Sequence, residues 1–308
     1  MADIRFDGRV AMVTGAGTGL GRSHALGLAK RGAKVVVNDL GVGRDGSGSS
    51  SEAAQAVVAE IEAMGGEALA HGCDVADEDG VIDMVTQAIA VWGRVDIVVN
   101  NAGILRDKTF AKMDMADFRK VVDVHLIGSA NVAHACWPIM REQKYGRIVF
   151  TSSASGLYGN FGQSNYGAAK ASMMGLMNVL HLEGARDNIR VNTLAPTAAT
   201  RMTEELLPAE AAELLAPETI TPGLLYLVSE DAPSRTILGA GAGSFALTKV
   251  YETPGITLMD DENTPEAVAA KFAEIAAAEG QEELTDAFSQ TKKYALNAAK
   301  ARGLKLDW

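Results

Sequence analysis

Short apolar segments rich in β-branched residues alternate with longer amphipathic segments along most of this 308-residue chain. The apolar segments are the expected strands, and they cover residues 9–14, 34–38, 95–100, 147–151 and 189–194. Several are apolar at nearly every position, which is typical of strands covered on both faces. Strands that alternate with helices form a parallel sheet, because each parallel connection has to cross back over the sheet. The sequence therefore predicts an α/β fold of the Rossmann type, a doubly wound parallel sheet in three layers.

Two stretches depart from this alternation. Residues 41–51 are rich in glycine and serine, which predicts either a mobile loop with a role of its own or a plain flexible connector. Beyond residue 251, Thr264 and Pro265 form the expected N-cap and first turn of a helix. We predict a catalytic domain of residues 1–250 and a helical C-terminal appendage of residues 251–308 that packs on the core and is not an independent domain.

The overall composition disfavours several classes of protein. A formal net charge of −11 repels nucleic-acid phosphates, so no nucleic-acid partner is expected. Two cysteines are too few for a disulfide framework, which favours a reducing, cytoplasmic setting. The charged N-terminus lacks the layout of a signal peptide, the C-terminal KLDW matches no targeting signal, and no apolar run reaches the roughly 18 residues of a membrane span. We expect neither export nor a membrane partner.

The first expected strand ends in a glycine-rich turn, TGAGTGLG, at residues 14–21. Glycines let the backbone bend tightly and approach a pyrophosphate, and the following helix directs its first N–H groups at the phosphates. Such a turn also occurs as a purely structural connection. Asp39 closes the second strand, where its carboxylate can accept hydrogen bonds from an adenosine ribose. The alternative for Asp39 is a helix cap or a loop carboxylate.

The choice between the two nicotinamide cofactors depends on the same residue. The Asp39 carboxylate would repel the 2′-phosphate of NADP, and the turn residues 16–18 offer no compensating cation. NAD is therefore the predicted cofactor. Arg44, in the glycine-serine loop, is the cation that could offset this preference.

A candidate catalytic group lies in the second half of the chain. Tyr166 and Lys170 are four residues apart in an expected helix, residues 162–184, so both side chains lie on one face. The Lys170 ammonium is expected to favour the phenolate of Tyr166, which could then act as base toward a substrate hydroxyl near neutral pH. Ser153 follows the fourth expected strand and can hydrogen-bond the same substrate oxygen. A Tyr-x-x-x-Lys pair alone is also common as an exposed helical pair.

Taken together, the TGAGTGLG turn, the NNAG run at residues 100–103 and the set Ser153, Tyr166 and Lys170 resemble the short-chain dehydrogenase/reductase family over residues 9 to about 245. The resemblance implies an NAD-dependent oxidoreductase acting on a secondary alcohol or ketone. It implies phosphate and ribose contacts near the turn, adenine contacts at Asp74 and Val75, and nicotinamide contacts around residues 196–200. The implied cofactor-binding residues are Gly15, Thr18, Gly19, Leu20, Gly21, Asp39, Asp74, Val75, Asn101, Ala102, Gly103, Tyr166, Lys170, Pro196 and Thr200.

The runs VVVNDLG, NNAGILRDKTF, QKYGRIVFTSSASGLYGNFGQSNYGAAK and APTAATRMT are similar to the dehydrogenase units of the type 2 peroxisomal multifunctional enzymes. This implies oxidation of (3R)-3-hydroxyacyl-CoA to 3-ketoacyl-CoA by a free-standing dehydrogenase, without hydratase or sterol-carrier regions. Only Arg106, Lys108 and Arg201 are local cations that could contact CoA phosphates.

Two positions depart from the common family pattern. His125 stands where many members have Asn, so it either replaces a polar anchor or is a satisfied buried histidine. Thr197 follows Pro196 in place of Gly. A steroid or other bulky-alcohol dehydrogenase and a ketoacyl reductase stay open, because residues 157–162 carry no readable specificity pattern. A non-catalytic dinucleotide-binding regulatory protein would be expected to lack the tyrosine or the lysine.

Two further expectations concern metal and assembly. No cluster of His, Cys or carboxylate residues has metal-ligand spacing, so hydride transfer without a metal is predicted. A homo-oligomer, dimer or tetramer, is expected through the helical segments 115–140 and 166–182, with Met173, Met174 and Met177 at the interface.

Overall fold

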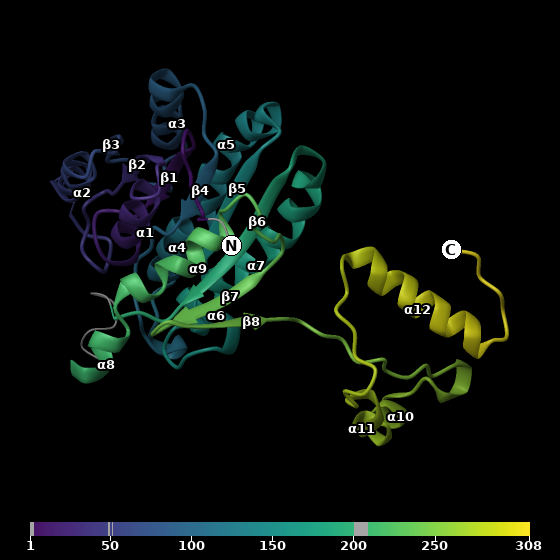
Figure 1. The fold of residues 1–308 in the computed structure, drawn as a ribbon. Coiled ribbons are helices and arrows are strands. Elements are labelled where there is room, and N and C mark those ends of the chain that lie inside the picture. The colour runs from purple at the N-terminus through teal and green to yellow at the C-terminus, as the bar shows by residue number, and fades with distance from the viewer. Residues whose placement is uncertain (1–2, 49, 51, 200–208) are drawn as a thin grey trace. The chain divides into compact units, whose positions relative to one another are not determined.

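The computed structural model describes residues 3–48, 50, 52–199 and 209–308. The chain divides into two compact units, Met1–Leu247 and Thr248–Trp308 (Figure 1). The predicted boundary after residue 250 lies three residues from this division. The packing of the C-terminal appendage on the core stays a prediction.

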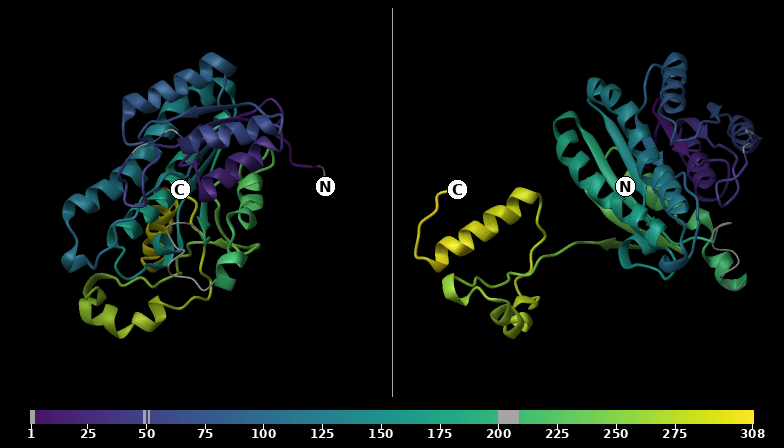
Figure 2. Two further views of the ribbon diagram at one scale, coloured as in Figure 1. Left: turned by 90° about the vertical axis from the view of Figure 1, so that its left-hand side faces the viewer. Right: turned by 180° about the vertical axis from the view of Figure 1, so that it is seen from behind.

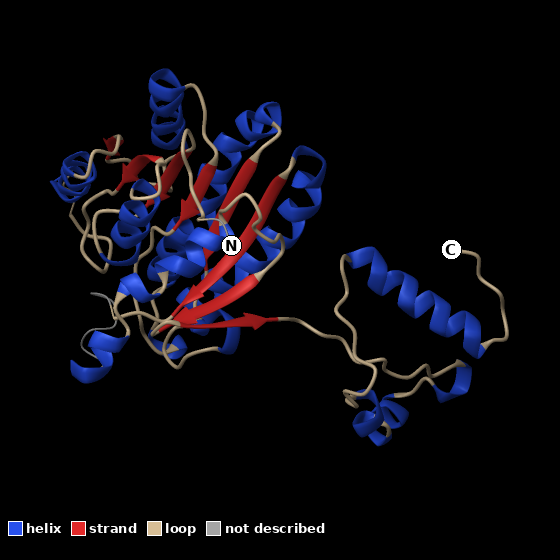
Figure 3. Cartoon of the chain, viewed as in Figure 1, coloured by secondary structure: helices blue, strands red, loops and turns tan. Residues whose placement is uncertain are grey.

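Eight strands form one sheet in the order β3-β2-β1-β4-β5-β6-β7-β8, drawn in red in Figure 3. The strands are β1 (Val10–Thr14), β2 (Lys34–Asn38), β3 (Ala68–His71), β4 (Ile97–Asn100), β5 (Gly146–Thr151), β6 (Ile189–Pro196), β7 (Ile237–Gly241) and β8 (Ser244–Thr248). Every pairing from β3 to β7 is parallel. The strand order reverses between β1 and β4, and such a switch point opens a crevice at the carboxyl ends of the strands.

Helices cover both faces of this sheet, as Figures 1 and 2 show. One apolar core lies under α1 (Gly19–Ala29), α2 (Glu52–Ala63) and α9 (Thr221–Leu227). The other lies under α3 (Glu78–Trp92), α4 (Met115–Val122), α5 (Gly128–Gln143) and α7 (Ser164–Gly184). Successive residues of a strand point to opposite faces of the sheet, so their side chains pack in different cores. In β1, for example, Val13 packs in the first core and Met12 in the second. The predicted three-layer Rossmann-type fold is confirmed.

Three strands were not predicted from the sequence. β3 has the sequence ALAH, lacks β-branched residues and is half-buried at the sheet edge. β7 contains two glycines, and β8 is mostly exposed. A two-residue turn joins these last two strands, and its residues Ala242 and Gly243 both have positive φ, as a tight hairpin of this kind requires.

The methionines of α7 correct the interface expected from the sequence. Met173 and Met177 are each only 1% exposed and pack in the core between α7 and the sheet. They share a helix face with Ala169 and Lys170, and that face is turned inward. Of the three methionines, only Met174 is partly exposed.

The second unit contains α10 (Pro265–Ala270), α11 (Phe272–Ile275) and α12 (Ala287–Ala301). The predicted N-cap is confirmed, because the Thr264 hydroxyl accepts a hydrogen bond from the Ala267 N–H at 3.2 Å. Lys293 forms ion pairs with Glu252 at 2.9 Å and Glu282 at 3.4 Å. The remaining short helices of the first unit are α6 (Ala154–Tyr158) and α8 (Ala209–Leu214). None of the helices in the described ranges has the length and apolar character needed to cross a bilayer.

Candidate active site

A cavity of about 430 Å³ opens at the carboxyl ends of the central strands and gathers almost all of the predicted site residues. The predicted residues that line it are Gly15, Thr18, Gly19, Leu20, Gly21, Asp39, Asp74, Val75, Asn101, Ala102, Gly103, Ser153, Tyr166, Lys170 and Pro196. The predicted contact Thr200 lies outside the described residues, and so does Arg201.

The glycine-rich turn after β1 has no room for side chains at two of its positions. Gly15 has φ +62°, and a Cβ there would lie 2.8 Å from the Ala102 Cα. A Cβ on Gly21 would lie 2.1 Å from the Gly15 carbonyl oxygen. The turn is therefore closed against both α1 and the end of β4, and its bare backbone forms the cavity wall where α1 begins.

The NNAG run holds this turn in place, a role that was not predicted from the sequence. The Thr14 hydroxyl accepts hydrogen bonds from the N–H groups of Asn101 and Ala102, both at 3.0 Å. The Asn101 side-chain amide donates to the carbonyls of Thr14 at 3.0 Å and Gly15 at 3.1 Å. An asparagine directly after a buried strand was the available signal, because a buried amide needs partners.

The Asp39 carboxylate is fixed at the end of β2 by two backbone groups. One oxygen accepts from the Gly17 N–H and the other from the Gly41 N–H, both at 2.7 Å. These bonds orient the carboxylate while each oxygen keeps a further acceptor site. Asp39 lines the cavity but does not cap a helix, since α2 begins only at Glu52. Farther along the wall, Asp74 forms an ion pair with Lys120 at 3.2 Å.

The glycine-serine loop is part of the cavity wall rather than a plain connector. Within it, the Gly43 N–H donates to the Ser47 carbonyl at 2.7 Å. The Arg44 carbonyl accepts from the Leu105 N–H, and the Arg106 guanidinium donates to the Asp45 carbonyl, both at 2.9 Å. Arg106 also pairs with Asp117 at 2.8 Å, and its predicted contact with CoA phosphates stays a prediction.

The three candidate catalytic residues come together in the structure. Ser153 begins α6 directly after β5, and its hydroxyl hydrogen-bonds the phenol of Tyr166 on α7. Lys170 lies one turn farther along α7, is 4% exposed, and donates to the Thr151 carbonyl at 2.6 Å. Its Nζ atom lies 5.7 Å from the centroid of the Tyr166 ring. Because Lys170 is buried, Tyr166 and Lys170 are not the exposed helical pair that was the alternative interpretation of their spacing.

Burial governs the protonation of this pair. It raises the pKa of Tyr166, an effect that the Ser153 hydrogen bond opposes and the Asp107 charge reinforces. Burial also lowers the pKa of Lys170 to about 7. In the protein without bound cofactor, the pKa of the Tyr166 phenol is therefore raised, whereas the sequence analysis expected the Lys170 ammonium to lower it. The physical reason is that the buried phenol would lose hydration as a phenolate, which disfavours its charged form.

His125 lies against Tyr166 in a π-helical turn, η2 (Asp123–Ile127), between α4 and α5. Its ring meets that of Tyr166 edge-on, with centroids 5.2 Å apart. Its Nε2 atom lies 2.9 Å from the carbonyl oxygen and 3.2 Å from the nitrogen of Ile104. Burial and the Lys170 charge lower the pKa of His125 well below its usual range. His125 is therefore a neutral anchor for Ile104, and within the described chain its Nδ1 atom is buried without a partner.

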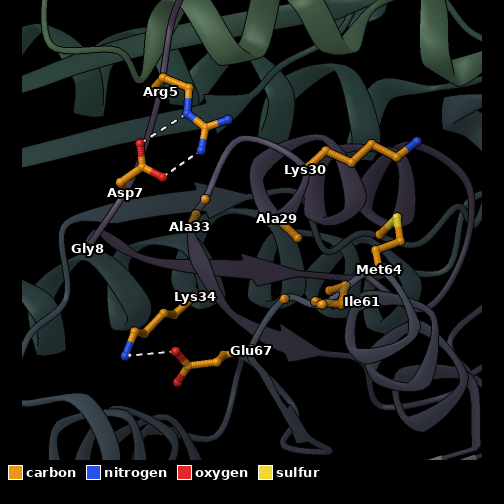
Figure 4. A pocket seen from close by; sticks show the side chains of 13 residues that line it. Arg5, Asp7, Gly8, Ala29, Lys30, Ala33, Lys34, Ile61, Met64 and Glu67 are labelled. Atoms are coloured by element: carbon orange, nitrogen blue, oxygen red, sulfur yellow. Dashed lines mark hydrogen bonds and ion pairs between the residues drawn. The ribbon is translucent and has the colours of Figure 1, made fainter.

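A second cavity, of about 410 Å³, contains none of the predicted site residues (Figure 4). Four of its charged side chains are already paired, Arg5 with Asp7 at 2.6 Å and Lys34 with Glu67 at 3.1 Å. Among the residues that the structure describes, no group of three or more His, Cys, Asp or Glu side chains is placed to hold a metal ion.

Comparison with known proteins defines the class. The family model for short chain dehydrogenases matches residues 9–211. The chain therefore belongs to the short-chain dehydrogenase family and is an oxidoreductase.

Individual relatives narrow this further. A short-chain type dehydrogenase/reductase of Mycobacterium tuberculosis is 50% identical over 268 residues, covering 87% of this chain and 93% of that protein. The peroxisomal multifunctional enzyme type 2 of Mus musculus is 47% identical over 275 residues, 88% of this chain but only 37% of that enzyme. The chain thus spans about a third of that larger relative. The resemblance to its dehydrogenase unit is confirmed.

A solved structure of 7α-hydroxysteroid dehydrogenase, complexed with NADH and 7-oxo glycochenodeoxycholic acid, superimposes with a TM-score of 0.71. It is 31% identical in sequence, and the match covers 79% of this chain and 98% of that one.

We expect Tyr166→Phe to abolish turnover while leaving cofactor affinity nearly unchanged, because only the exchangeable proton is lost. The loss of a positioned acid-base group costs about 10²–10⁴-fold in rate. Lys170→Ala should reduce both turnover and cofactor affinity. Steady-state kinetics and a fluorescence titration of the cofactor measure the two effects, and turnover of Tyr166→Phe within a few-fold of wild type would show that another group is the base.

The raised pKa of Tyr166 predicts opposite pH dependence in the two directions of the reaction. Alcohol oxidation needs the phenolate, so its rate should rise through the neutral and alkaline range, whereas ketone reduction needs the phenol and should fall only at alkaline pH. Ser153→Ala removes a hydrogen bond that lowers this pKa, so the rising limb should move to higher pH. A limb that stays in place, or moves lower, would contradict this account of the Ser153 hydrogen bond.

Proposed function

We propose that the chain oxidises the 3-hydroxyl group of a (3R)-3-hydroxyacyl-CoA to the 3-ketoacyl-CoA, with NAD as the acceptor. The observation that carries the proposal is the single cavity that holds both the Asp39 carboxylate and the Ser153, Tyr166 and Lys170 group. The similarity to the type 2 multifunctional enzyme supports the acyl-CoA substrate.

NAD(H) is the cofactor that fits this cavity. The turn residues Gly15 and Gly19 line the cavity where α1 begins, so backbone N–H groups at the start of that helix are available to a pyrophosphate. The fixed Asp39 carboxylate can accept both hydroxyls of the adenosine ribose. Asp74 and Val75 would hold the adenine, and Lys170 the nicotinamide ribose. When bound, NAD supplies the hydride acceptor.

Residues of the chain itself would transfer the proton of the substrate hydroxyl. Ser153 and Tyr166 are hydrogen-bonded to each other and together can hold one substrate oxygen between them. Tyr166 removes the proton of that hydroxyl as the ketone forms, and returns it in the reverse direction. Lys170, held by the Thr151 carbonyl, would in its charged form stabilise the Tyr166 phenolate that accepts this proton.

Two alternatives in the same family have some support. The structural similarity to the 7α-hydroxysteroid dehydrogenase supports a steroid as an alternative substrate. A 3-oxoacyl-[acyl-carrier-protein] reductase of Synechocystis, 43% identical over 199 residues, keeps ketoacyl reduction in consideration. A regulatory protein without turnover is disfavoured, because all three candidate catalytic residues are present and assembled.

The test is a substrate panel measured by the absorbance of reduced nicotinamide. (3R)- and (3S)-3-hydroxyacyl-CoAs, a 7α-hydroxysteroid and simple secondary alcohols would be compared with NAD. The proposal expects the highest kcat/KM with a (3R)-3-hydroxyacyl-CoA. A higher value for the steroid, or for the (3S) isomer, would overturn it.

We expect the wild type to prefer NAD over NADP by at least about tenfold, which corresponds to about 1.4 kcal/mol. Asp39→Ser should narrow this gap, because it removes the charge that repels a 2′-phosphate. The ratio of kcat/KM values with the two cofactors measures the effect. Equal efficiency in the wild type would show that a cation such as Arg44, which also lines the cavity, already compensates.

A homo-oligomer built on α7 is a further part of this proposal. With Met173 and Met177 inside the monomer, the outward face of α7 presents Val179 and Leu182, which are 53% and 50% exposed. We expect Val179→Glu to shift the assembly toward monomer, because the interface would then bury a charge. Sedimentation at low micromolar concentration measures this, and a single 32 kDa species for the wild type would contradict it. A cytoplasmic location stays a prediction.

A further inference from the structure

A lysine lines the end of the active-site cavity that would hold the adenine of NAD(H). Lys120 lies on α4, and its ammonium nitrogen is 3.2 Å from a carboxylate oxygen of Asp74. Both side chains line the cavity, and they are 36% and 30% exposed. The two residues are 46 positions apart in the sequence, so only the fold brings them together.

The backbone on both sides of Asp74 is held in place by side-chain amides. The Asn38 amide donates to the Cys73 carbonyl at 3.1 Å. The Asn131 amide, on α5, donates to the Val75 carbonyl, also at 3.1 Å. Asn38 is the last residue of β2, so the first bond ties this segment to the strand that leads to the proposed ribose contact. The freedom that remains at Asp74 is the direction of its carboxylate.

Two donors fix that direction. One carboxylate oxygen of Asp74 accepts from the Ala76 N–H at 2.9 Å, and the other accepts from the Lys120 ammonium. A carboxylate has about four acceptor sites, so it can still accept from a ligand. The 6-amino group of adenine is a donor, whereas the 6-oxo group of hypoxanthine or guanine is an acceptor that a carboxylate repels. A fixed carboxylate at this place can therefore select the base.

We propose that Lys120 is a positioning residue for the adenine end of NAD(H): it holds the Asp74 carboxylate in the direction that accepts the 6-amino group. This inference rests on NAD(H) as the cofactor of the proposed function. Without Lys120, the carboxylate would keep the Ala76 bond to one oxygen and could turn about it. The rival role for Lys120 is a counter-charge for the pyrophosphate, which would strengthen the binding of a dinucleotide whatever its base.

The test measures dissociation constants by fluorescence titration of the full-length protein with NADH and with reduced nicotinamide hypoxanthine dinucleotide. The two ligands differ only in the base. We expect the wild type to bind NADH at least about tenfold more tightly, because the analogue replaces a hydrogen bond to a charged group with a repulsive contact. Lys120→Met should reduce this ratio to about threefold or less, because the carboxylate is then no longer fixed. Lys120→Arg can still donate to the carboxylate and should keep most of the ratio.

A double-mutant cycle shows whether Lys120 acts through Asp74. Asp74→Ala should abolish the preference for NADH, and adding Lys120→Met to it should then change each dissociation constant by less than about twofold. The matched control is Arg119→Met, which removes a charge from the neighbouring, exposed position of α4 outside the cavity lining. This control should leave both dissociation constants as in the wild type.

Three results would overturn the inference: equal affinity of the wild type for the two dinucleotides, a preference for NADH that Lys120→Met retains in full, or an equal loss of affinity for both ligands in that variant. The last result would assign Lys120 to the pyrophosphate. In all three cases NADH still binds, so the proposed cofactor stands. If the wild type binds neither dinucleotide, the proposed function itself fails, and the role of Lys120 fails with it.

Discussion

The buried side chain of Lys170 controls the geometry of this active site. Lys170 is 4% exposed, and its hydrogen bond to the Thr151 carbonyl ties the inward face of α7 to the end of β5. Tyr166 lies one helical turn away on the same face, and Ser153 follows Thr151 by two residues. One contact therefore sets the positions of all three groups. The same burial lowers the pKa of the lysine to about 7 and raises that of the tyrosine, so packing and proton chemistry share a cause.

The cofactor end of the cavity depends on hydrogen bonds between neighbouring strands. Thr14 at the end of β1 and Asn101 just after β4 bind each other's backbone, and this closes the glycine-rich turn at the switch point of the sheet. Asp39 is held in the same way by N–H groups of the turn and of the loop that follows β2. The site is thus assembled before any ligand binds, which reduces the entropy that binding has to remove.

Cations near the mouth of the cavity differ in their partners. Arg106 forms an ion pair with Asp117 and donates a hydrogen bond to the carbonyl of Asp45, and it thereby holds the glycine-serine loop against the cavity wall. Lys108 and Lys112, a few residues away, are exposed, and their side chains form no ion pair within the described ranges. Charge type alone does not separate these roles. The difference arises because Asp117, on α4, places its carboxylate 2.8 Å from the guanidinium of Arg106, which lies in the loop after β4.

The sequence determined the layers of the sheet and the glycine-rich turn, and it singled out the three candidate catalytic residues, because these follow from local periodicity and from short motifs. It missed β3, β7 and β8, whose residues are small, exposed or glycine-containing and carry no local strand signal. Only the tertiary structure decided that Met173 and Met177 face the core, that Asn101 supports the turn, and that burial raises the pKa of Tyr166. Each of these features depends on side chains that are distant in the sequence but pack together in the fold. A local sequence pattern carries no information about such contacts.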